Sequence, residues 1–168
     1  VSEDEYISMI EGKTAAIFEI AGWAGALISG ASESVAEAMK VWGRELGLCF
    51  QIVDDMIDLL ADSTKSGKLQ GSDLMQGKQT LVVIHALEHA DPEQRSIIQN
   101  VLGSGDAADP ESLAMCMDVL VTLGSIDHAL KRAHHSHDLA IECLSVLAEG
   151  KAKELLTTLT HYQLEREA

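Results

Sequence analysis

The strongest constraint on this chain is a group of three aspartates, Asp54, Asp55 and Asp58, set in a mostly apolar run. Aspartate is unfavourable inside a helix, and a charged carboxylate is seldom buried without a partner. If the run is helical, Asp54 and Asp58 lie one turn apart on one face, where their like charges repel each other. The pattern therefore indicates a cation that the chain itself does not supply there.

A hard divalent metal ion is the obvious candidate for that cation. Mg²⁺ takes one or two carboxylates and completes its shell with waters and phosphate oxygens. The alternative, a solvated acidic helix face, leaves the flanking apolar residues unexplained. We predict a Mg²⁺ site with Asp54 and Asp58 as direct or water-mediated ligands, and with Asp55 as an anchor or salt-bridge partner.

A lysine-rich stretch follows the aspartates. Residues 62–80 hold glycines and serines around two Gly-Lys pairs, Gly67-Lys68 and Gly77-Lys78, which favours a loop over a helix. Lysine binds phosphate as a mobile point charge. Lys78 has the alternative of pairing with an aspartate. Upstream, Lys13-Thr14 opens another apolar helix, so the chain combines carboxylates, lysines and an apolar wall, as a diphosphate ester with an apolar tail requires.

Taken together, these motifs resemble a known family. The run from Gly47 to Asp58, followed by Gly67-Lys68, Gly71-Ser72-Asp73 and Gly77-Lys78-Gln79-Thr80, is similar to the second aspartate-rich region of the trans-isoprenyl diphosphate synthases, or polyprenyl synthetases. Lys13-Thr14 resembles that family's Lys-Thr pair. The similarity covers essentially the whole chain but only the C-terminal half of the family. It implies an all-α fold, the C-terminal half of an isoprenoid-synthase-type helical bundle, with residues 1–168 as a single helical domain.

The resemblance also implies roles for single side chains. The residues that would bind the allylic diphosphate and assist its reaction are Lys13, Thr14, Gln51, Lys68 and Lys78, and Phe18 would line the pocket for the tail. Gln51 would point into the allylic pocket and help to stabilise a carbocation. Taken alone, Gln51 also fits a hydrogen-bonded core amide, and Phe18 fits an ordinary core residue.

The implied function is a trans-prenyltransferase that condenses isopentenyl diphosphate with an allylic diphosphate to give a longer polyprenyl diphosphate, with Mg²⁺ as cofactor. The chain contains no second DDxxD motif and no Arg-Arg pair. In the family, the other half carries both. We therefore expect an enzyme subunit that is active only with a partner that supplies the first DDxxD motif, in a heteromer or through self-association.

Three other functions remain open. One is a non-catalytic regulatory or structural subunit of a prenyl synthase assembly, although such a subunit need not keep Asp54, Asp58, Lys13 and Lys68. Another is a terpene cyclase of related fold, but those enzymes usually carry a different second metal motif. The third is a helical interaction module without chemistry.

Composition excludes some classes of partner. The net charge of −15 argues against nucleic acid and against anionic membrane surfaces, both of which attract basic proteins. The cysteines, Cys49, Cys116 and Cys143, form no CxxC pair and fit reduced buried thiols. The N-terminus is acidic and unlike a signal peptide, so we expect a cytoplasmic protein. The longest apolar stretch, residues 15–31, includes Glu19 and glycines, and we expect a buried helix rather than a membrane span.

Helical periodicity dominates the chain, and prolines are scarce. We predict helices over about 4–30, from Ser32 or Ser34 to about 60, over 80–90, 92–102 and 110–124, from Ser125 to about 148, and from 151 to the C-terminus. The histidines at 134, 135 and 137 are predicted to form an exposed polar face, because no third metal ligand is obvious at helical spacing.

Overall fold

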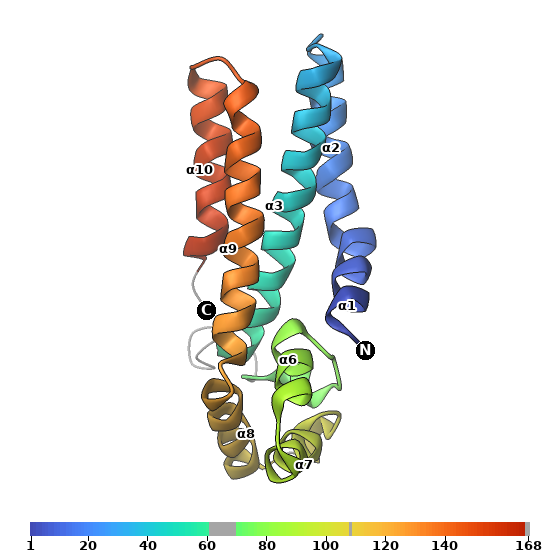
Figure 1. Ribbon diagram of the computed structural model, residues 1–168, viewed down its shortest axis with the longest axis vertical. Helices are drawn as coiled ribbons and strands as arrows, with labels where there is room; N and C mark the ends of the chain where they lie inside the picture. The colour runs from blue at the N-terminus through green and yellow to red at the C-terminus, as the bar shows by residue number, and fades with distance from the viewer. Residues whose placement is uncertain (61–69, 108, 167–168) are drawn as a thin grey trace. The chain divides into compact units, whose positions relative to one another are not determined.

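The computed structural model describes residues 1–60, 70–107 and 109–166. These ranges are mostly helical and contain no β-strand, which confirms the predicted all-α class (Figure 1). The elements are α1 (Glu3–Ile10), η1 (Glu11–Ala15), α2 (Ala16–Ile28), α3 (Glu33–Leu60), α5 (Ser72–Met75), α6 (Leu81–His89), α7 (Pro92–Val101), η2 (Gly105–Ala107), α8 (Pro110–Thr122), α9 (Ser125–Cys143), η3 (Leu144–Val146) and α10 (Lys151–Glu165).

Two of the predicted helix starts are fixed by aspartate caps. Asp91 accepts a hydrogen bond from the backbone N–H of Gln94, whose side chain bonds back to the N–H of Asp91, and Pro92 takes the first position of α7. Asp109 caps α8 ahead of Pro110. Such caps satisfy N–H groups that a helix start leaves unpaired, and proline has no N–H to satisfy.

The structure departs from the predicted elements in three places. The first helix is interrupted by the π-helical segment η1, which the apolar periodicity does not signal. The predicted loop contains the short helix α5, and residues 61–69 of that loop lie outside the described residues. The helix predicted to reach residue 148 ends at Cys143 and continues as the 3₁₀ turn η3.

The described chain divides into two compact units, each built from distant parts of the sequence. The aspartate unit comprises Val1–Tyr6 and Asp54–Lys131, and the bundle unit comprises Ile7–Val53 and Arg132–Arg166. The prediction of a single domain over residues 1–168 is not tested by this division and stays a prediction.

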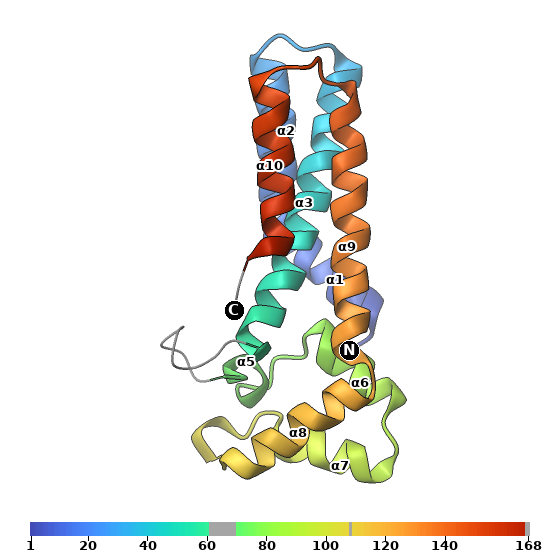
Figure 2. The same cartoon turned by 90° about the vertical axis from the view of Figure 1, so that its left-hand side faces the viewer.

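In the bundle unit, α2 runs beside the part of α3 that belongs to it, and α10 runs beside the part of α9 that belongs to it (Figures 1 and 2). The buried residues of its core are Ala26, Ala36, Met39, Trp42, Leu46, Ala140 and Leu144. The indole Nε1 of Trp42 donates a hydrogen bond of 3.0 Å to Thr160 Oγ1. The polar atom of the ring is therefore satisfied, and the rest of the indole can pack as an apolar surface.

Glycines allow α2 and α3 to approach each other closely. A Cβ atom on Gly43 would lie 2.2 Å from the carbonyl oxygen of Phe18, and one on Gly47 would lie 2.6 Å from the Cα of Ala15. Both neighbours are backbone atoms, which cannot move aside without shifting a helix. The two helices therefore pack with almost no side chain between them at this level.

The prediction of an exposed histidine face is wrong for His137. Its side chain is buried, its Nε2 lies 2.9 Å from His161 Nδ1, and its Nδ1 lies 2.9 Å from Asp138 Oδ1. The reason is helical spacing: His137 shares a face of α9 with Ala133 and Ala140, and both of these are buried. His134 and His135 are exposed as predicted.

The cysteine prediction agrees with the structure. All three thiols are free, Cys49 and Cys116 are buried, and Cys143 is half-buried. Burial raises the pKa of Cys49 to about 12 and that of Cys116 to about 11. Both buried thiols are therefore protonated and unreactive at neutral pH.

Taken singly, no helix in the described ranges has the length and apolar composition of a bilayer span. Helix α8 and the segment Ser125–Val146 meet those criteria only as a pair, and the pair is bent by 58°.

We expect Gly43→Ala to destabilise the chain by about 1–3 kcal/mol, because the added methyl group overlaps the backbone of α2. Gly25→Ala is the matched control, since a Cβ atom there meets nothing within 4 Å. Alanine also favours the helix over glycine by up to about 1 kcal/mol, so the control variant should be unchanged or more stable. Urea unfolding of both variants measures the difference, and equal stabilities would contradict the packing of α2 on α3.

Candidate functional site

The last turns of α3 place the three aspartates in different surroundings. Asp54 is exposed, Asp58 is half-buried, and the side chain of Asp55 is only 4% exposed. Successive residues of a helix are rotated by about 100°, so neighbouring carboxylates cannot share one environment. Ile52 and Leu59, one turn before and one turn after Asp55 on the same face of α3, are both buried, so this carboxylate is on the packed side of the helix.

Asp55 has a protein donor on each of its oxygens. The hydroxyl of Tyr6 donates to Oδ2 at 2.7 Å, and the ammonium of Lys78 donates to Oδ1 at 2.7 Å. Tyr6 is 1% exposed, and burial, followed by the nearby charge of Asp55, raises the pKa of its hydroxyl well above the ordinary value. The phenol therefore stays protonated and remains a donor. Of the roles that the sequence left open for Asp55, the structure shows the salt-bridge partner.

Lys78 bridges two aspartates. Besides Asp55, its ammonium donates to Asp73 Oδ2 at 2.5 Å, and its backbone N–H bonds to the carbonyl of Asp73. Burial lowers the pKa of Lys78, but the hydrogen bonds and charges of the two carboxylates outweigh burial and leave the pKa raised. Pairing with an aspartate was the alternative that the sequence left open for Lys78. Its predicted role at a diphosphate stays a prediction.

Asp58 holds the start of α5. Its Oδ1 accepts from the hydroxyl of Ser72 at 3.1 Å, and its Oδ2 accepts from the backbone N–H of Asp73 at 2.8 Å. Gly71, with a φ of +71°, turns the chain into this position, and its N–H bonds to the carbonyl of Asp58. Each carboxylate oxygen has a second lone pair, so these bonds fix the carboxylate and still leave acceptor capacity for a metal.

Two members of this cluster were not predicted as site residues. Asp73 links the group, because its side chain binds Lys78 and its N–H binds Asp58. Its place in the Gly71-Ser72-Asp73 motif was a signal that it has a role. The sequence indicates only that Tyr6, if buried, needs a hydrogen-bond partner. It does not identify that partner, Asp55, which lies 49 residues away.

The donors of the cluster fit a hard cation better than a soft one. In the described ranges, no three His, Cys, Asp or Glu side chains are grouped so as to hold a metal ion by themselves. Mg²⁺ does not need such a cage, because it is usually held by one or two carboxylates and completes its shell with waters and phosphate oxygens. Asp54 and Asp58 supply carboxylate oxygens of this kind, so the residues fit Mg²⁺ that arrives with a phosphorylated ligand.

In the bundle unit, Thr14 and Gln51 meet. The hydroxyl of Thr14 donates to Gln51 Oε1 at 2.8 Å, and Gln51 is 8% exposed. Thr14 and the exposed Lys13 lie in η1, and π-helical turns within helices often occur at functional sites. The structure thus joins two residues that the sequence assigned to substrate binding, and their roles stay predictions. Lys68 lies outside the described residues.

Phe18 packs within the bundle unit. Its ring lies 5.5 Å from that of Phe50, and it contacts the core residues of the unit.

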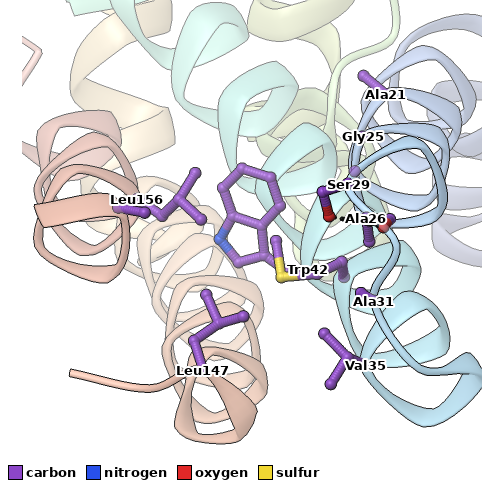
Figure 3. Close-up of a pocket in the computed structure, with 12 residues that line it drawn as sticks. Ala21, Gly25, Ala26, Ser29, Ala31, Val35, Trp42, Leu147 and Leu156 are labelled. Atoms are coloured by element: carbon purple, nitrogen blue, oxygen red, sulfur yellow. Dashed lines mark hydrogen bonds between the residues drawn. The ribbon is translucent and has the colours of Figure 1, made fainter. Parts of the chain in front are cut away.

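Closer to the α2–α3 turn, a mostly apolar cavity of about 370 Å³ opens among Trp42, Val35, Leu156, Leu147 and small residues of α2 (Figure 3). Phe18 is not among the residues that line it.

Comparisons with known proteins find one family. The family model described as Polyprenyl synthetase matches residues 1–120. The chain is 39% identical over 167 residues to a short chain isoprenyl diphosphate synthase of Methanothermobacter thermautotrophicus, covering 99% of the chain and 50% of that protein. It is 33% identical over 165 residues to the octaprenyl diphosphate synthase of Haemophilus influenzae, covering 98% of the chain and 50% of that protein.

Solved structures give the same result. The crystal structure of geranylgeranyl pyrophosphate synthetase from Pyrococcus horikoshii matches with a TM-score of 0.92 and 38% identity, over 99% of this chain and 50% of that one. A decaprenyl diphosphate synthase from Rhodobacter capsulatus matches with a TM-score of 0.88 and 33% identity, over 100% and 51%. The fold is therefore that of the isoprenoid synthases, and the chain spans about half the length of these relatives.

We expect Lys78→Met to lower the free energy of unfolding by about 1–3 kcal/mol, because it removes the cation from the buried Asp55. The figure is below that of a fully buried pair, since the Lys78 side chain is 33% exposed. Lys40→Met is the control: Lys40 is 42% exposed and lies 3.8 Å from Glu19 and from Glu37, so its loss should cost about 0–1 kcal/mol. Urea unfolding at pH 7 measures both, and equal losses would show that the Asp55 pair is no stronger than a surface pair.

Proposed function

This chain belongs to the polyprenyl synthetase family, and on that premise we propose that it is a subunit of a trans-prenyltransferase. The proposed reaction condenses isopentenyl diphosphate with an allylic diphosphate to give a longer polyprenyl diphosphate. The observation that carries the proposal is the anchored aspartate group at the end of α3. Asp55 and Asp58 are each fixed by two protein donors, so the protein itself sets the geometry of the group.

The proposed role of this group is to hold Mg²⁺ against a diphosphate. Asp54 and Asp58 would bind the metal directly or through water, while Asp55 acts as their anchor. Bound there, Mg²⁺ would neutralise the charge that develops on a departing diphosphate. Lys68, by the resemblance of its Gly-Lys pair, would bind phosphate oxygens. Lys78 would keep Asp55 and Asp73 in place and is the second lysine assigned to the diphosphate.

In the bundle unit, the proposal assigns Lys13, Thr14 and Gln51 to the allylic substrate. Lys13 is exposed and can present its charge to a phosphate. Thr14 fixes the side-chain oxygen of Gln51 with a bond of 2.8 Å, which orients the amide. An oriented amide dipole can stabilise a carbocation better than one that must reorganise during the reaction.

We also propose that the chain acts with a partner that supplies the first DDxxD motif, either a second kind of subunit or another copy of this chain. One face of α2 supports this, because it is exposed in this chain where the sequence predicts a buried helix over residues 15–31. Ile17, Ile20 and Ile28 are 69%, 62% and 87% exposed, and Leu27 on the same face is 44% exposed. A helix that is apolar on nearly all sides is normally buried in its complete assembly.

We expect Mg²⁺ together with a bisphosphonate, a stable analogue of diphosphate, to raise the melting temperature by several degrees. Binding to the native state at about 100 times the dissociation constant adds about 2.7 kcal/mol. Asp54→Asn should remove most of this gain, whereas Asp118→Asn, at another exposed aspartate of the same unit, should keep it. Differential scanning fluorimetry with and without EDTA measures the effect. A chain that gains nothing from the two ligands would instead fit a helical interaction module without chemistry.

We expect Ile20→Lys to abolish the association with the partner without unfolding the chain, because this side chain is already exposed. Val121→Lys is the control, at an equally exposed apolar residue of α8, with 61% of the side chain exposed against 62% for Ile20.

Affinity purification from the native source, followed by mass spectrometry, should yield a stoichiometric protein with its own DDxxD motif and Arg-Arg pair. With that protein the chain should turn over isopentenyl diphosphate and an allylic diphosphate. Turnover by the chain alone as a monomer would overturn the partner proposal.

A further inference from the structure

The start of α1 is fixed before it reaches the aspartate group. Ser2 and Glu5 form a reciprocal cap, with bonds of 2.8 Å from Ser2 N–H to Glu5 and 3.2 Å from Glu5 N–H to the Ser2 hydroxyl. Glu3 lies 2.8 Å from His128 Nε2 on α9, within the same unit. The next residue of the helix to point inward is Tyr6, which is 1% exposed. The segment therefore presents a phenol from a fixed position.

The hydroxyl of Tyr6 sets the orientation of Asp55. It takes Oδ2, which leaves Oδ1 for Lys78. The ammonium of Lys78 is then shared between Asp55 and Asp73, and the N–H of Asp73 holds Asp58. Without the hydroxyl, Asp55 could rotate and offer both oxygens to Lys78, which would draw the ammonium away from Asp73.

From this series of hydrogen bonds we infer that Tyr6 is a positioning residue for the metal-binding aspartates. It acts through Asp55, Lys78 and Asp73 on Asp58, and it does not itself touch metal or substrate. The inference rests on the proposed function, since it concerns the geometry in which the aspartate group receives a divalent ion with a diphosphate. A hydrogen bond to a charged, buried carboxylate is strong enough for this role, because such bonds are shorter and stronger than neutral ones.

The test is Tyr6→Phe, which removes one oxygen atom and keeps the ring that fills the core. Tyr162→Phe, at a tyrosine that is 57% exposed, is the matched control. The probe is Mn²⁺ with a bisphosphonate, followed by the electron paramagnetic resonance signal of free Mn²⁺, so that no turnover is needed. We expect Tyr6→Phe to weaken Mn²⁺ binding about tenfold, equal to about 1.4 kcal/mol, and the control to bind as the wild type does.

A second control separates positioning from simple docking of α1. Glu3→Gln weakens the other tether of α1, its contact with His128, and leaves Tyr6 and Asp55 in place. If the phenol only docked the helix, Glu3→Gln would weaken Mn²⁺ binding as much as Tyr6→Phe does. We expect it to bind Mn²⁺ as the wild type does, even where its melting temperature falls.

The outcomes separate this inference from the proposed function. Wild-type protein that binds no Mn²⁺ with the bisphosphonate would overturn both. Wild-type binding together with an unchanged Tyr6→Phe, or with an equal loss in Glu3→Gln, would overturn only the role of Tyr6. Should Tyr6→Phe not fold, Asp55→Asn gives a second test at the next member of this series of hydrogen bonds, because the amide nitrogen replaces one of the two carboxylate oxygens and cannot accept a bond. Unchanged Mn²⁺ binding in that variant would overturn the inference that Asp55 positions Asp58 through hydrogen bonds.

Discussion

A buried carboxylate needs donors on both of its oxygens, and in this protein Asp55 obtains them from two distant parts of the chain. Tyr6 comes from the start of the sequence and Lys78 from the loop after α5. Both contacts lie within the aspartate unit, and the same unit holds Asp54 and Asp58 of α3. Lys78 donates to Asp73, and the N–H of Asp73 donates to Asp58, so hydrogen bonds connect Asp55 with Asp58. Asp54 lies about 100° around the helix from Asp55 and is exposed.

The bundle unit depends on a different constraint, the close packing of helices at glycines, which have no side chain. Gly43 and Gly47 let α3 lie directly against the backbone of α2 and of the end of η1. This contact brings the ring of Phe18 beside Phe50 and the hydroxyl of Thr14 onto Gln51. The residues that the sequence assigned to the allylic substrate are thus held by helix packing, whereas the aspartates are held by charge and hydrogen bonds.

Local signals in the sequence predicted most of the helices. Asp91-Pro92 and Asp109-Pro110 mark helix starts because their caps act over three residues, and the aspartate motif with its lysine loop identified the family. What the sequence could not supply depends on contacts between distant residues. The bond from Tyr6 to Asp55 spans 49 residues, and the contact of His137 with His161 on α10 spans 24. The π-helical turn at Lys13-Thr14 also has no periodic signature, since it adds a residue to one turn without changing which residue types are apolar.

The sharing of Lys78 between two aspartates has a consequence for how ligands arrive. The formal charges of Asp54, Asp55, Asp58 and Asp73, four negative, and of Lys78, one positive, leave −3 for these five residues. A field of this sign attracts divalent cations and repels a bare diphosphate. We therefore expect metal-loaded diphosphate to be the species captured at the end of α3, so that the concentration of free divalent ion governs how fast the ligand associates.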